Sequence, residues 1–202
     1  QGLRIMTTKY IRKNVWDNGG GWENESLFWY AKGVAKMRER PLSDHRSWGF
    51  FAAIHGINMD ELDDTGEPQL TWHQLNDFPE FQNVDIKALI KTYDADKQKN
   101  PKGQGFWNQC QHATWYFLPW HRGYLLGIES VLRDAIIELG GPKDWALPYW
   151  YYNDPNHTDS NKNILIPPAF TAKTLIDVDQ SEIKNPLYIA QRYASDASNP
   201  TY

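Results

Sequence analysis

Apolar residues recur at the three- and four-residue spacing of an amphipathic helix in three parts of the chain. These parts predict helices over residues 25–40, 43–55 and 120–139. Asn24 and Ser43 stand where the N-caps of the first two helices belong, and Pro41 ends the first helix. The third helix has the clearest apolar stripe, made of Tyr124, Ile128, Val131, Leu132, Ala135, Ile136 and Leu139.

The second predicted helix places a histidine on its apolar face. Trp48, Phe51, Ala52 and His55 stand at positions i, i+3, i+4 and i+7. We therefore expect His55 to face the core together with these residues. An imidazole without a partner is costly to bury, so His55 needs one.

The remaining segments show little regular pattern. Residues 1–22 predict a short strand or an extended arm that ends in the glycine-rich turn 18–21. Glycine and proline break residues 57–108 repeatedly, apart from one predicted short helix over 84–93, and so long a connection suggests a functional loop. The proline-rich tail after Trp150 predicts a surface loop. The fold class is therefore mainly α, a bundle of helices with long loops and little strand.

The composition fits one ordinary globular domain. Of 202 residues, 41% are hydrophobic and 23% are charged. The net charge of -4, without a long run of one sign, argues against a nucleic-acid partner. No apolar run is long enough to cross a membrane. The chain starts at Gln1 and not at Met, which is typical of a processed product or a fragment and leaves the compartment open.

Three of the six histidines are candidates for ligands. The other three, His45, His73 and His157, stand among polar residues in turn-like sequence, so we interpret them as solvated or hydrogen-bonded side chains. His112 and His121 flank the aromatic run 115–120, and His55 lies on an apolar stripe. Imidazoles within so much aromatic surface need partners, and a metal ion is an efficient one.

The spacing of His112 and His121 is compatible with one site. Nine residues on a single straight helix would put them on opposite faces. Pro119 prevents such a helix, because it favours a helix that begins near it and keeps Leu118 out of the helical region. His121 would then lie in the first turn of that helix. Imidazole ligands suit copper or zinc, and the alternative is three separately hydrogen-bonded core histidines.

Several segments resemble a known family. Residues 117–126, Phe-Leu-Pro-Trp-His-Arg-Gly-Tyr-Leu-Leu, resemble the first copper-binding signature, CuA, of the type-3 dicopper family of tyrosinases and polyphenol oxidases. Residues 53–56, 145–150 and 185–188 resemble three further landmarks of that family, in the right order. The resemblance implies that residues 1–202 form the N-terminal, CuA-bearing half of a tyrosinase-like catalytic domain, a helical bundle around a dinuclear copper site.

The resemblance also implies roles for individual residues. His55, His112 and His121 match the three ligands of the first copper. Phe117 matches an aromatic residue that packs beside the ligands. Cys110 and His112 match a Cys-x-His triplet in which the cysteine sulfur is bonded to the histidine ring as a thioether.

The sequence departs from the family in its second half. A complete member has two coppers, and three further histidines on later helices bind the second. Beyond Trp150 this chain offers only His157. We therefore expect a complementary chain or segment to carry the second copper site.

The activity implied by the resemblance is copper-dependent oxidation of phenols or o-diphenols to o-quinones with dioxygen, as in tyrosinase or catechol oxidase. A dioxygen carrier resembling molluscan hemocyanin, which covers its copper pair against phenols, is the first alternative. The second alternative is a zinc-binding or structural module with three histidines. A catechol assay separates the enzyme from the carrier, and metal analysis separates copper from zinc.

Overall fold

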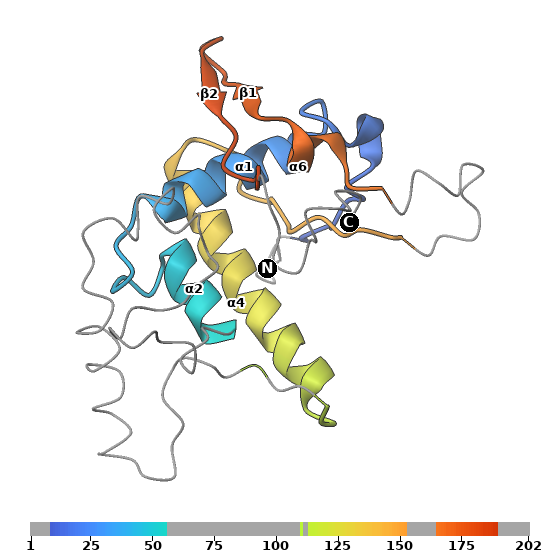
Figure 1. Cartoon of the computed structure of the whole chain (residues 1–202), viewed down its shortest axis with the longest axis vertical. Coiled ribbons are helices and arrows are strands. Elements are labelled where there is room, and N and C mark those ends of the chain that lie inside the picture. Colours follow the sequence, from blue (N-terminus) through green and yellow to red (C-terminus); the bar gives the residue numbers. More distant parts are fainter. Residues whose placement is uncertain (1–8, 56–109, 111–112, 153–164, 190–202) are drawn as a thin grey trace, which may run out of the picture. The chain divides into compact units, whose positions relative to one another are not determined.

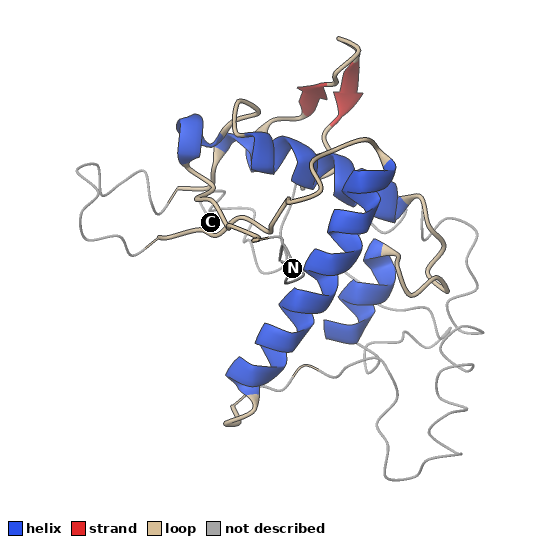
Figure 2. Ribbon diagram, turned by 180° about the vertical axis from the view of Figure 1, so that it is seen from behind, coloured by secondary structure: helices blue, strands red, loops and turns tan. Residues whose placement is uncertain are grey.

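The computed structural model describes residues 9–55, 110, 113–152 and 165–189 (Figure 1). In chain order the elements are η1 (Asp17–Gly20), α1 (Glu25–Arg38), α2 (Trp48–His55), α4 (Phe117–Glu138), α6 (Pro168–Thr171), β1 (Thr174–Ile176) and β2 (Glu182–Lys184). The described part of the chain is mainly helical and has little strand, as the sequence predicts (Figure 2). The helix predicted over 84–93 lies outside the described residues. None of the described helices has both the length and the hydrophobicity that a membrane span requires.

The chain divides into two compact units. Unit 1 comprises Gln1–Ala35 and Glu129–Ala190, and unit 2 comprises Lys36–Ile128 and Gln191–Tyr202. Helices α1 and α4 each contribute residues to both units.

The core of unit 1 confirms the apolar stripes predicted for the first and third helices. Asn24 caps α1, since its Oδ1 accepts the backbone N–H of Ser26 at 3.0 Å. Gly33 lets α1 approach α4 closely, because a Cβ there would lie 3.0 Å from Ile136. Leu139 is an exception to the prediction, because the helix ends before it and its side chain is exposed. The buried hydrophobic residues of these two helices in unit 1 are Leu27, Ala31, Val34, Leu132, Ala135 and Ile136.

Within the described residues 9–16, the N-terminal arm forms no strand, and its only pairing of the strand type is one isolated bridge. Asn14 makes an isolated parallel bridge to Tyr149, with Val15 N–H donating to the Tyr149 carbonyl at 2.9 Å. The chain then turns through η1, where Asn18 and Gly19 have φ values of 54° and 83°. These left-handed conformations suit asparagine and glycine and explain the glycine-rich turn.

The prediction of a surface loop after Trp150 is wrong for residues 165–189. This segment forms α6 and the antiparallel pair β1 and β2, in which Leu175 stands opposite Ile183 and is buried. The side chain of Asn185 donates to the carbonyls of Ala169 and Ala172. Strands of three residues are too short to show an alternating pattern, and hydrogen bonds to backbone carbonyls leave no hydrophobic signal.

Helix α2 in unit 2 begins later than predicted. Asp44 accepts the Arg46 N–H and closes a turn, so the helix starts at Trp48 and its cap is Ser47, not Ser43. The Ser47 hydroxyl accepts the Phe50 N–H at 3.0 Å.

The buried face of α2 also differs from the predicted one. The helix buries Gly49, Phe50 and Ala53. The predicted stripe, Trp48, Phe51, Ala52 and His55, is half-buried to exposed. An eight-residue helix with apolar residues on both faces gives no periodicity by which to choose between them.

Candidate metal centre

His121 lies in the second turn of α4. The sequence had predicted that it would lie in the first turn. The helix begins at Phe117, so Leu118 is helical and Pro119 falls within the first turn. This is possible because the first N–H groups of a helix have no partner within the helix, and a proline there loses no hydrogen bond. A proline disfavours the helical conformation of the residue before it, but Leu118 is helical here all the same.

One turn of α4 fixes the orientation of the His121 ring. Its Nδ1 lies 2.7 Å from the Phe117 carbonyl oxygen. A carbonyl only accepts hydrogen bonds, so Nδ1 carries the proton and donates, and Nε2 keeps its lone pair for a metal. The Phe117 ring lies against the same imidazole, with centroids 4.2 Å apart.

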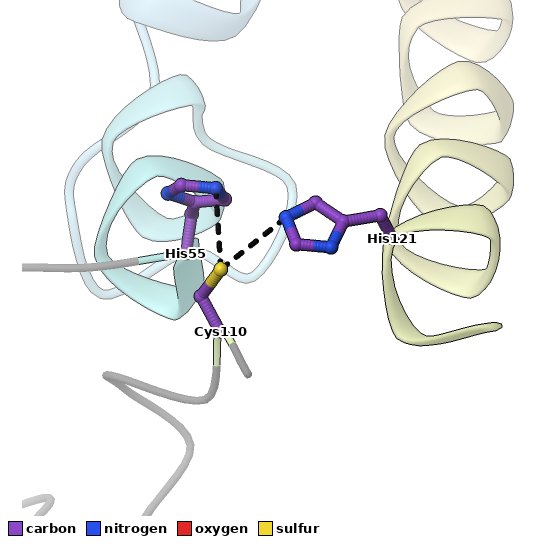
Figure 3. A group of neighbouring side chains, drawn as sticks. All are labelled: His55, Cys110 and His121. Carbon is purple, nitrogen blue, oxygen red and sulfur yellow. Dashed lines mark hydrogen bonds between the residues drawn. The ribbon is translucent and has the colours of Figure 1, made fainter. Parts of the chain in front are cut away.

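Two histidines and the cysteine converge in unit 2 (Figure 3). His55 comes from the end of α2 and His121 from α4, and Cys110 lies between them. The Cys110 Sγ is 3.5 Å from Nε2 of His55 and 3.3 Å from Nε2 of His121. One ligand atom from each residue lies within 4.8 Å of the other two.

Hydrogen bonds hold this cluster together through a shared thiol. Burial raises the pKa of the Cys110 thiol, so the sulfur keeps its proton and can donate to Nε2 of His121. A metal ion at the same point would replace that proton, since thiolate and neutral imidazole are the ligating forms. Nitrogen and sulfur donors suit copper or zinc and not magnesium or calcium, so the residues fit the metal that the sequence predicts.

The ring of His55 lies among three side chains of α4. Its centroid is 6.0 Å from that of Trp120, 5.5 Å from that of His121 and 5.7 Å from that of Tyr124. The cluster is therefore built on the facing sides of α2 and the first half of α4, which lie side by side in Figures 1 and 2.

Tyr124 is a residue of this site to which the sequence gave no role beyond burial. Its hydroxyl donates to the Phe51 carbonyl oxygen at 2.8 Å, and its ring stacks on Trp120 with centroids 5.2 Å apart. Burial, and secondarily the charge of a Cys110 thiolate, raise the pKa of Tyr124 to about 12. The phenol therefore stays protonated as a donor. Its spacing of three residues from His121 and four from Trp120 was the available signal.

The other predicted residues have different outcomes. His112, His73 and His157 lie outside the described residues. His45 packs on Phe50, with ring centroids 4.8 Å apart. The position of Cys110 between two histidines was not predicted, since the sequence had assigned it to His112.

The start of α4 and the turn before it expose large apolar side chains in unit 2. Trp115 is 80% exposed and Leu118 is 75% exposed. Large apolar side chains that are exposed together on one segment commonly mark an interaction site. We call this surface the α4 apolar face; it consists of Trp115, Tyr116, Phe117, Leu118, Leu125 and Leu126.

Unit 1 holds a buried charge network at the other half of α4. Glu129 is 5% exposed and accepts hydrogen bonds from Arg12 and from Arg133, at 2.6 Å and 2.7 Å. Arg133 also donates to the Trp145 carbonyl and lies over the ring of Tyr10. The network ties the N-terminal arm and the segment at Trp145 to one helix.

Comparisons with known proteins bear on the family and the fold of this chain. The family model described as the common central domain of tyrosinase matches residues 45–201. A tyrosinase of Hahella sp. (strain CCB-MM4) is 36% identical over 165 residues, which cover 79% of this chain and 30% of the relative. A tyrosinase of Gallus gallus is 28% identical over 133 residues, which cover 57% of this chain and 24% of the relative. The chain thus spans less than a third of the length of either protein.

A solved structure shows the same fold. Mushroom tyrosinase, in a crystal that holds its latent and active forms, superposes with a TM-score of 0.54 over 90% of this chain and 28% of the other. The two sequences are 16% identical. This likeness concerns the fold alone.

Proposed function

The chain belongs to the tyrosinase family, and from this premise we propose that it carries the first copper site of an enzyme that oxidises phenols or o-diphenols to o-quinones with dioxygen. The observation that carries the proposal is the convergence of His55 and His121 on one point in unit 2. Both belong to segments that the family model covers.

The proposed ligands of this copper are His55, His112 and His121. The geometry of the cluster supports His55 and His121, and the position of Nδ1 on the Phe117 carbonyl supports ligation by Nε2 of His121. His112 is proposed from its sequence spacing alone. Bound copper supplies a one-electron redox change that side chains lack.

The rest of the site holds the ligands and the substrate. The rings of Phe117 and Trp120 lie beside that of His121, at centroid distances of 4.2 Å and 4.8 Å. We propose that such aromatic walls exclude water and accept the flat ring of a phenol. The proposal covers two activities. Oxidation of monophenols would be monooxygenase activity, and oxidation of o-diphenols would be catechol oxidase activity.

We propose that residues 1–202 act as the N-terminal half of the catalytic domain and that a complementary chain or segment binds the second copper. The short span relative to the Hahella tyrosinase, 30% of its length, supports this proposal. The α4 apolar face supports it as well, because exposed apolar surface commonly marks an interaction site.

We also propose a thioether between Cys110 and His112. The sulfur would bond to a ring carbon as the thiol and the ring each lose a hydrogen, and dioxygen would accept the two electrons and two protons. The intact mass of the denatured, reduced chain should then be lower by two hydrogens, with no titratable thiol. A free thiol in copper-loaded protein would contradict the link.

The direct test uses the complete protein loaded with copper. Catechol and air should give the absorbance of an o-quinone, and the metal-free protein should give none. Reversible oxygen binding without quinone would instead indicate a carrier. Purification with zinc, and no oxidation after exchange for copper, would indicate a structural metal site.

A further inference from the structure

One side chain connects the two helices that hold the clustered histidines. The Tyr124 hydroxyl on α4 donates to the carbonyl oxygen of Phe51 on α2 at 2.8 Å. In an α-helix the carbonyl of residue 51 pairs with the amide of residue 55. The bond from Tyr124 therefore reaches the last turn of α2, the turn that ends with His55.

The ring of Tyr124 is fixed at the same time. It stacks on Trp120 at 10° between the ring planes, and its centroid lies 5.7 Å from that of His55. His121 precedes Tyr124 by three residues and so lies on a neighbouring part of the same helical surface. Tyr124 is thus anchored on the helix of one histidine and bonded to the helix of the other.

We propose that Tyr124 is a positioning residue, whose hydrogen bond to the Phe51 carbonyl sets the separation of His55 and His121. This inference rests on the proposed copper site. The two imidazole centroids are 5.5 Å apart. A metal site requires its ligands to be held within about 0.5 Å of the productive geometry. Ring packing permits sliding between helices, whereas a hydrogen bond has a preferred length and direction. The hydroxyl therefore restrains sliding between α2 and α4, which the packing of the ring alone does not prevent.

A purely structural role makes a different prediction. If the hydroxyl only satisfies a half-buried carbonyl, its removal lowers stability and leaves the bound metal unchanged. If it positions the ligands, its removal also changes the affinity and the geometry of the metal. Outer partners that orient ligands typically change metal affinity by about 10- to 100-fold.

The test compares variants of the full 202-residue chain. Cu(I) affinity is measured by competition with bicinchoninate, and the electron paramagnetic resonance spectrum of the Cu(II)-loaded chain reports ligand geometry. Tyr124→Phe removes only the hydroxyl, and we expect Cu(I) affinity to fall about 10-fold or more and the copper hyperfine coupling to change. Tyr30→Phe is the matched control, because its half-buried ring stacks on Trp145 in unit 1.

Two unnatural residues isolate the hydrogen bond. Tyr124→4-aminophenylalanine keeps a donor at the same place and should restore affinity and spectrum. Tyr124→4-methylphenylalanine fills the space without donating and should behave as Tyr124→Phe.

Each result has a defined meaning. Failure of the unsubstituted chain to bind copper would contradict the proposed function itself. Normal binding and an unchanged spectrum in Tyr124→Phe would overturn only the positioning role. Variants without the donor that fail to fold would assign the hydroxyl to stability and overturn the role as well.

Discussion

The two units use clustered polar groups in opposite ways, buried in unit 1 and half-buried to exposed in unit 2. In unit 1, the carboxylate of Glu129 meets the guanidinium groups of Arg12 and Arg133, so donors and acceptors complement one another. In unit 2, the side chains of His55, Cys110 and His121 bring together nitrogen and sulfur atoms that can each donate an electron pair to a cation. Complementary charges stabilise a fold without a further component. A convergence of like donors is instead typical of a ligand site.

The largest effect is expected when residues 1–202 are tested without the segment that carries the second copper site. Residues 1–202 expressed alone with copper should show no catechol oxidation and bind at most one copper per chain. The α4 apolar face should also make the isolated chain self-associate. Quinone formation and light scattering measure the two effects. Steady turnover by a monodisperse monomer would refute the division of the site between two segments.

The next effect removes one donor from the cluster. His121→Ala in the complete protein should abolish binding of the first copper and lower oxidase activity by about 100-fold or more, because an open coordination position weakens the site. His45→Ala is the control, since His45 packs on Phe50 in the same unit. Copper content and turnover that both match the unsubstituted protein would remove His121 from the site.

A substitution in unit 1 should change stability without changing the metal. Glu129→Gln leaves two guanidinium groups without their carboxylate and should destabilise the fold by about 3 kcal/mol. The copper affinity of the folded fraction should stay unchanged. Urea denaturation measures the first effect and chelator competition the second. Asp134→Asn, an exposed position on the same helix, serves as control. An equal effect of both substitutions would show that the network contributes nothing.

The smallest effect tests the turn before α2. The hydrogen bond from Arg46 lowers the pKa of Asp44 below its ordinary value of 3.8. Asp44 therefore stabilises the fold above its unfolded-state pKa, and this contribution is lost as the pH falls through the depressed value. Asp44→Asn should cost a few tenths of a kcal/mol at pH 7. Urea midpoints should converge once the pH is below the depressed pKa, and a difference that persists there would argue against the carboxylate.

The sequence predicted what long periodic segments and residue types encode. The apolar stripes of α1 and α4 cover several turns, so their buried faces were predictable. His55 and His121 were singled out among the six histidines by their apolar surroundings and by the family resemblance, and the structure brings the two side chains together. The strands β1 and β2, three residues each, were missed because they are too short for a pattern.

Most of the contacts that the sequence could not predict are hydrogen bonds from side chains to backbone carbonyls. His121 is oriented by the Phe117 carbonyl, Tyr124 is bonded to the Phe51 carbonyl, and Arg133 is bonded to the Trp145 carbonyl. Every residue has a carbonyl, so the sequence carries no sign of which one will accept. The tertiary arrangement selects it. Side-chain pairs can be inferred from residue types, whereas these contacts require coordinates.

The cap of α1 has a consequence for glycosylation. Asn24, Glu25 and Ser26 form the triplet that N-glycosylation enzymes recognise. A sugar would be attached to the side-chain nitrogen of Asn24, but this nitrogen donates to the carbonyls of Asn14 and Val15 at 3.0 Å and 3.1 Å. The residue is 3% exposed. A glycan on this nitrogen would replace one of its two hydrogens and so remove at least one of these bonds, and a side chain so buried leaves a sugar no room. Glycosylation at Asn24 is therefore incompatible with this fold.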